Sequence, residues 1–314
     1  MNEPGRSCPL RYRYGAAAIA RVTPRPVRTL YVIGGLYGNS PALDAVERMA
    51  AEEPGPATLC FNGDFNWFDV ADEEFAEINR RVLAHHATLG NVEAELGNPD
   101  DGAGCGCAYP ETVDAGTVRR SNRIHARLKA TADRHRGVLA RIAQLPMFAR
   151  YQVGGCRVGV VHGDAQSLAG WRFDVSALDD PQATNWIRSA FVDAEVDVFA
   201  GSHTCLPALR RFDVGPGRHG WVSNNGAAGM ANFRADLAGL CTRIATTPSP
   251  HAVLRETQIG GAYLALLPVR FDVARWQAMF LAQWPPRSPA WVSYFERITR
   301  GPHFEPARAL GLVT

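Results

Sequence analysis

The sequence has almost no lysine and no excess of charge of either sign. Lys129 is the only lysine, arginine supplies the rest of the positive charge, and the formal net charge at pH 7 is +2. Proteins whose main partner is a nucleic acid or an anionic membrane carry strongly basic surfaces. The charge balance therefore argues against both as the main partner.

Long hydrophobic runs are also missing. A helix that crosses a bilayer needs about 20 apolar residues, and no run in this chain approaches that length. The short apolar stretch 16–20 ends at once in Arg21 and Pro24, so we do not interpret it as a signal peptide. Seven cysteines are an odd number spread over a long chain, which does not indicate a disulfide framework. We expect a cytoplasmic protein.

Apolar strands alternate with amphipathic helices near the N-terminus. The runs 29–33 and 57–61 are typical of buried strands, and residues 88–89 continue the series. Ser40 is the expected N-cap of the first intervening helix, with Pro41 after it, and residues 72–86 form the second helix. This order predicts an α/β fold with a largely parallel sheet.

The rest of the chain is less regular, but no linker divides it. We expect a loop excursion at 97–118, followed by a helix from its N-cap Ser121 to Gln144. Strands are expected at 151–153, 156–161 and 196–200, with a helix at 179–192 before the last of them. Short strands follow from 208 to 267, and helices at 273–281 and 290–298 end the series. The predicted organisation is an N-terminal extension (1–27), one domain (28–270), and a C-terminal helical tail (271–314) packed on that domain.

Polar side chains follow directly after several of the predicted strands. They are Asp64, Asn91, His162 and His203. In open α/β sheets, ligands bind beyond the carboxyl ends of the strands. Carboxylate, amide and imidazole groups together suit a hard or borderline metal ion. The sequence therefore predicts a metal site formed by these four residues.

In order and spacing, these segments resemble the motifs of the calcineurin-like metallophosphoesterases, bacterial type. The family motifs D-x-H-G-N, G-D, G-N-H-[DE], a lone His and G-H-x-H correspond to residues 35–39, 63–64, 90–93, 162–163 and 202–205, and residues 224–229 are similar to its N-P-G-S-x-G loop. The resemblance covers about residues 29–235. It implies a four-layer α/β/β/α sandwich, here with a C-terminal helical tail, and a metal-dependent phosphoester hydrolase.

The resemblance implies one intact metal site. Asp64 matches the carboxylate that bridges two metals in the family, and Asn91, His162 and His203 match the remaining ligands of one of them. We expect one divalent transition metal ion there, which would be Zn, Fe or Mn. Asp64 and His203 are also candidate catalytic residues.

The ligands of the second metal are altered, so the first motif is degenerate and a second ion is doubtful. An Asp, a His and the last His of G-H-x-H are replaced by Gly35, Tyr37 and Cys205, and the His that assists the leaving group is Val92. Tyr37 is either a packed aromatic residue or a candidate catalytic donor. Cys205 is a further candidate ligand, because a thiolate favours Zn or Fe over Mg or Mn.

Cys105 and Cys107 form a possible second source of soft ligands, if the excursion folds back over the site; otherwise they lie in a surface loop. Three functions remain open. The first is a phosphoester hydrolase acting on a small phosphorylated molecule. The second is a non-catalytic pseudo-phosphoesterase that binds a partner. The third is a soft-metal or metalloid site with different chemistry. A homo-oligomer is compatible with each of them.

Overall fold

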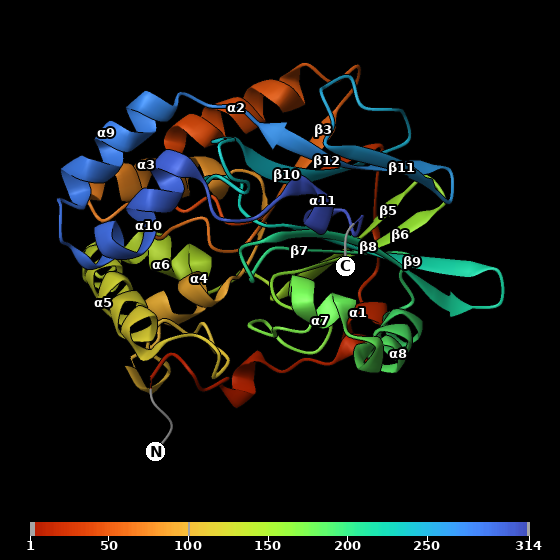
Figure 1. The fold of residues 1–314 in the computed structure, drawn as a ribbon, viewed down its shortest axis with the longest axis horizontal. Helices are drawn as coiled ribbons and strands as arrows, with labels where there is room; N and C mark the ends of the chain where they lie inside the picture. Colours follow the sequence, from red (N-terminus) through yellow and green to blue (C-terminus); the bar gives the residue numbers. More distant parts are fainter. Residues whose placement is uncertain (1–3, 100, 313–314) are drawn as a thin grey trace.

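The computed structural model describes residues 4–99 and 101–312, so the outermost residues of the predicted extension and tail, and residue 100 of the excursion, lie outside the described residues. The described chain forms two mixed sheets of six strands, packed face to face and flanked by helices (Figure 1). This is the α/β/β/α sandwich that the sequence predicted.

The first sheet carries the strands nearest the N-terminus at its centre. β2, β3 and β4 run parallel to one another, and β10 pairs with β2 in the antiparallel sense. In spatial order the strands are β11 (Arg255–Ile259), β12 (Ala262–Val269), β10 (Gly239–Ala245), β2 (Thr29–Ile33), β3 (Ala57–Asn62) and β4 (His86–Thr88).

The second sheet is built mainly from the middle of the chain, and its strands β6 and β7 are parallel. Its spatial order is β1 (Arg25–Val27), β5 (Phe148–Val153), β6 (Cys156–Val161), β7 (Val198–Gly201), β9 (Arg218–Asn225) and β8 (Pro207–Gly215). Because β1 pairs with β5, part of the N-terminal segment 1–27 is a strand of this sheet.

Successive side chains along each strand point to opposite faces of its sheet, and this alternation separates the inner layer from the outer layers. In β2, Leu30 and Val32 pack between the two sheets, whereas Tyr31 and Ile33 pack under the outer helices. The outer face of the first sheet is covered by α2 (Ser40–Ala51) and α3 (Asp72–Val82). The outer face of the second is covered by α1 (Ala16–Ala20), α7 (Val175–Asp179) and α8 (Thr184–Ala194).

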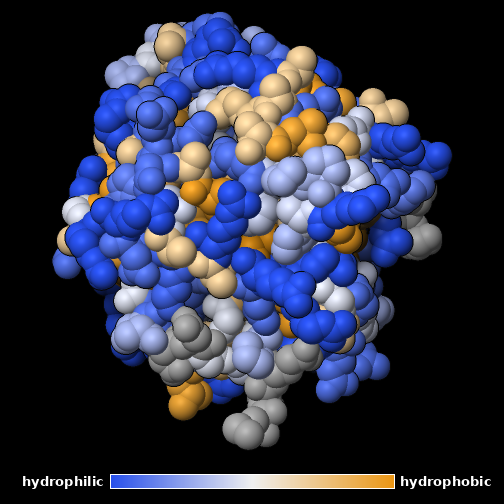
Figure 2. Space-filling model, turned by 90° about the vertical axis from the view of Figure 1, so that its left-hand side faces the viewer, coloured by the Kyte–Doolittle hydropathy of each residue, from blue (hydrophilic) through white to orange (hydrophobic). Residues whose placement is uncertain are grey.

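A further group of helices packs at the end of the sandwich where β3 and β4 terminate. It consists of α4 (Asn91–Leu96), α5 (Ala115–Ala132), α6 (Arg136–Ile142), α9 (Val273–Gln283) and α10 (Pro289–Arg300); the short α11 (Pro306–Ala309) follows. An aromatic cluster including Trp67, Phe68, Trp276 and Phe280 joins these helices to the loop after β3. Figure 2 shows their outer face, which is mostly hydrophilic with small apolar areas.

Several predicted helix ends were wrong. Asn39, not Ser40, caps α2, because its side chain accepts a hydrogen bond of 2.9 Å from the backbone of Ala42. The predicted helix 121–144 begins earlier, after the capping residue Asp114, and is divided into α5 and α6. Ser121 is buried inside α5.

Tertiary contacts explain the break between α5 and α6. Arg134 and His135, which lie between the two helices, both bond to Asp72 at the start of α3. Such contacts override local helix propensity. The helix α4 was not predicted at all, because its six residues are too few for a periodic pattern. In the described residues, no helix has both the length and the apolar content to cross a membrane.

Candidate metal centre

Four polar side chains converge where β3, β6 and β7 end and α4 begins. The Nε2 atom of His162 lies 3.3 Å from Oδ1 of Asp64, 3.1 Å from Oδ1 of Asn91, and 3.2 Å from Nδ1 of His203. All four residues are buried. The structure therefore brings together the residues that the sequence assigned to one metal.

Hydrogen bonds on the outer sides of these residues fix which atoms face inward. Nδ1 of His162 donates to the carbonyl of Asn62 at 2.9 Å, and Nε2 of His203 donates to the carbonyl of Cys107 at 3.1 Å. The inner nitrogens of the neutral rings therefore carry lone pairs. The amide nitrogen of Asn91 donates to the carbonyl of Cys105 at 2.9 Å, so its oxygen also faces inward.

The inner atoms are thus four acceptors, and acceptors about 3 Å apart repel one another unless a cation or a proton lies among them. Burial and the neighbouring His162 lower the pKa of His203 to about 3. Burial alone would lower the pKa of His162, but the Asp64 carboxylate outweighs it and raises this pKa. Backbone carbonyls orient the two imidazoles and the amide, and the Val92 backbone N–H donates to Oδ1 of Asp64 at 3.2 Å. Two imidazoles, a carboxylate and an amide oxygen fit a divalent metal ion.

Glu93 holds the Asp64 turn in place. Its carboxylate accepts backbone hydrogen bonds from Asp64 at 2.8 Å, from Asn66 at 3.1 Å and from Gly90 at 3.2 Å. Burial, followed by the nearby Asp64 charge, raises the pKa of Glu93 to about 7. Asp64 itself has a φ of 51°, a left-handed conformation uncommon outside glycine and typical of functional sites.

The positions matching the second metal hold a different arrangement. The Tyr37 hydroxyl oxygen lies 2.9 Å from the Cys205 sulfur. A Cβ atom on Gly35 would lie 2.9 Å from Cε2 of Tyr37, so the tyrosine ring fills the space that a side chain at position 35 would need. Among the described residues, the group whose geometry could hold a metal ion contains Asp64 and two histidines but not Cys205.

Val92 is buried, and no imidazole replaces its side chain in the cavity. His125 of α5 donates from Nε2 to the Val92 carbonyl at 3.1 Å. It does not line the cavity described below. Among the described residues that line the cavity, the one histidine is His203, so no imidazole takes the place of the Val92 side chain.

The excursion 97–118 does fold back over the site. Cys105 and Cys107 form a disulfide, and they contact Asn91 and His203 through backbone carbonyls, as described above. The amide of Asn91 also lies 3.4 Å from Sγ of Cys107. In this oxidised state the pair supplies no thiolate, and its role is to orient two of the candidate ligands.

A small cavity of about 40 Å³ opens onto Asp64, Asn91 and His203. Its rim is aromatic and was not foreseen from the sequence. The rim residues are Trp67, Tyr109, Trp171 and Tyr294. They come from four separate segments. In the sequence, Tyr294 of α10 has the pattern of an ordinary core residue. No spacing rule connects such residues before the chain is folded.

Comparison with solved structures identifies the architecture. A metallophosphoesterase from Sphaerobacter thermophilus superposes with a TM-score of 0.55 at 15% identity, covering 88% of this chain and 100% of that one. A hypothetical protein from Pyrococcus horikoshii OT3 gives 0.56 at 15% identity, covering 88% and 99%. No protein-family model and no curated protein matches the sequence. The chain has the metallophosphoesterase fold, as its motifs predicted.

Proposed function

We propose that this protein is a metal-dependent phosphoester hydrolase that works with a single divalent ion, held by Asp64, Asn91, His162 and His203. The observation that carries this proposal is the convergence of four acceptor atoms, three of which lie 3.1–3.3 Å from the fourth, Nε2 of His162. Their nitrogen and oxygen chemistry suits Zn²⁺, Fe²⁺ or Mn²⁺.

A bound ion would supply Lewis-acid chemistry, polarising a phosphoryl oxygen and acidifying water. The protein residues would hold the ion and orient the groups that bind it. The carbonyls of Asn62 and Cys107 keep both histidines in the tautomer whose inner nitrogen is free. Val92 cannot donate a proton, so we expect substrates whose leaving groups need little protonation.

Access to the centre limits which substrates can react. A volume of about 40 Å³ admits an ion with one or two waters, whereas ligand pockets are usually at least 300 Å³. Hydrolysis of a phosphoester therefore requires the aromatic rim to move. The same small volume argues against catalysis and so favours the second candidate function, a non-catalytic pseudo-phosphoesterase that binds a partner.

Metal analysis tests the site, and turnover then separates the two candidates. We expect about one equivalent of transition metal per chain, lost in a His162→Ala/His203→Ala variant and retained in His85→Ala, which alters a histidine outside the centre. Equal metal in the wild type and the double variant would overturn the site. If metal is bound but p-nitrophenyl phosphate esters are not hydrolysed by the loaded protein, the non-catalytic alternative holds.

A further inference from the structure

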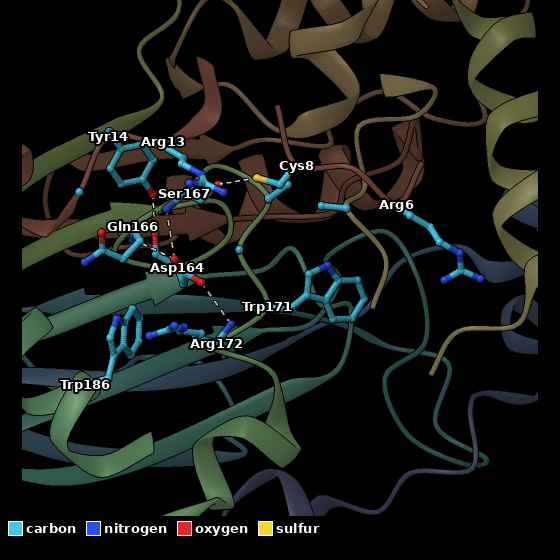
Figure 3. Close-up of a pocket in the computed structure, with 14 residues that line it drawn as sticks. Arg6, Cys8, Arg13, Tyr14, Asp164, Gln166, Ser167, Trp171, Arg172 and Trp186 are labelled. Carbon is cyan, nitrogen blue, oxygen red and sulfur yellow. Dashed lines mark hydrogen bonds between the residues drawn. The ribbon is translucent and has the colours of Figure 1, made fainter. Parts of the chain in front are cut away.

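A second and much larger cavity, of about 890 Å³, lies beside the metal centre. The N-terminal segment forms one wall, and the turn after β6 and the start of α8 form the others (Figure 3). Trp171 lines both this pocket and the small metal cavity. We call it the arginine pocket. Its main lining side chains are Arg6, Arg13, Tyr14, Trp171, Arg172 and Trp186.

The lining is positively charged. Arg6 is tied to the excursion, because its guanidinium donates to the carbonyls of Pro110 at 2.9 Å and Val113 at 2.8 Å. Arg13 and Arg172 are exposed, and neither forms an ion pair with any residue that the structure describes. These two guanidinium groups therefore retain donors for a ligand.

The one carboxylate in the described lining does not neutralise them. Asp164 is 3% exposed, and its oxygens accept backbone hydrogen bonds from Gln166 at 2.8 Å, Ser167 at 3.1 Å and Arg172 at 3.2 Å. It is engaged in closing the turn.

Aromatic surface lies next to the positive charge. The Arg172 guanidinium is 4.5 Å from the ring centroid of Trp186, and Figure 3 shows the two side chains together. Trp171 borders the pocket on its other side. A cavity of this volume suits a small-molecule ligand, and arginine is the residue that best matches the geometry of phosphate.

We propose that the arginine pocket binds a small phosphorylated molecule bearing a planar ring, such as a nucleoside monophosphate. Arg13 and Arg172 hold the phosphate, and Trp171, on the other side of the pocket, contacts the ring. The binding does not depend on catalysis. The further statement that this molecule resembles the substrate of the hydrolase rests on the function proposed above.

Trp171 connects the pocket to the metal centre. Its indole Nε1 donates at 3.0 Å to the Cys107 carbonyl, the same atom that accepts the hydrogen bond from His203. The rings of Trp171 and His203 are also in edge contact, with centroids 5.2 Å apart. A ligand that stacks on Trp171 therefore contacts a residue that shares the Cys107 carbonyl with His203, a metal-ligand candidate.

Adenosine 5′-monophosphate is the probe, with adenosine and inorganic phosphate as its two halves. Isothermal titration and tryptophan fluorescence should give saturable binding of the nucleotide, at least tenfold tighter than either half. Arg13→Gln and Arg172→Gln should each weaken it at least tenfold, and Arg136→Gln, an exposed arginine of α6, should leave it unchanged. Circular dichroism of each variant checks folding, and both altered arginines are exposed.

The same titration in His162→Ala/His203→Ala separates this inference from the proposed function. Binding retained there supports the arginine pocket even if the metal centre proves inactive. Binding lost there places the nucleotide at the metal centre and overturns the inference. Three other results would also overturn the inference. The first is no saturable binding of the nucleotide, and the second is binding by folded Arg13→Gln and Arg172→Gln that equals that of the wild type. The third is nucleotide binding that is no tighter than phosphate binding.

Discussion

The hydroxyl of Tyr37 and the sulfur of Cys205 are 2.9 Å apart and close the region beside Gly35. Tyr37 and Cys205 both have left-handed backbone conformations, with φ values of 56° and 62°. Burial raises the pKa of both side chains, so both are neutral at pH 7. A neutral phenol bonded to a neutral thiol is a poor ligand pair. We interpret the contact as packing that fills the region beside Gly35.

Tyr37→Phe tests this interpretation. Removing the hydroxyl breaks one buried hydrogen bond, so we expect stability to fall by about 1 kcal/mol in denaturant unfolding. The metal content should not change, because the hydroxyl is not a ligand. Tyr263→Phe on β12 is the matched control. A large loss of metal from Tyr37→Phe alone would show that the phenol binds the ion.

Glu93→Gln tests how firmly the Asp64 turn is held. An amide keeps only one acceptor oxygen, whereas Glu93 accepts three backbone hydrogen bonds with two oxygens. We expect metal affinity to fall about 10-fold or more, as is usual when a residue that supports a ligand is changed. Competition with a chelator measures the affinity. Glu73→Gln on α3 should behave as the wild type, and unchanged affinity in Glu93→Gln would contradict the role.

The buried ion pair of Glu53 and Arg243 predicts how stability depends on pH. Both side chains are fully buried, and the guanidinium contacts the two carboxylate oxygens at 2.6 and 2.8 Å. Burial alone would raise the pKa of Glu53, but the hydrogen bonds from Arg243 and Tyr31 outweigh it, and the net pKa lies below 4.5. Ionised Glu53 therefore stabilises the fold above about pH 4.5, and this contribution is lost as the pH falls through the folded-state pKa.

Glu53→Gln should consequently cost about 3–5 kcal/mol near neutral pH, because Arg243 is left without its partner. The difference from the wild type should shrink as the pH is lowered below about 4.5. Urea unfolding at several pH values measures it, with the exposed Glu111→Gln as control. A difference that is constant with pH would show that the charge of Glu53 is not what matters.

The sequence predicted the candidate site best where the direction of the strands determines which side chains lie close together. β2, β3 and β4 are parallel within the first sheet and β6 and β7 within the second, so in each sheet the residues after these strands lie at one edge. That is why Asp64, His162 and His203 could be grouped in advance. The roles of Asn62 and Cys107 could not be foreseen, because both act through backbone carbonyls, which every residue has.

Contacts between distant segments of the chain could not be predicted from the sequence either. Trp171 comes from the turn after β6 and Tyr294 from α10, and each carries only an aromatic side chain that would fit any core. The break between α5 and α6 depends on Asp72, more than 60 residues earlier. Local patterns place a residue on an element, but they do not say which other element it will touch.

The disulfide between Cys105 and Cys107 gives the last prediction. It constrains the carbonyls that orient Asn91 and His203. Cys105→Ser/Cys107→Ser, or reduction with dithiothreitol, frees this segment, so we expect metal affinity to fall about 10-fold. Cys8→Ser, which changes a free cysteine, is the control. A rise in affinity, with a cobalt–thiolate absorption band on reduction, would instead show that the released thiolates bind the ion, as the soft-metal alternative requires.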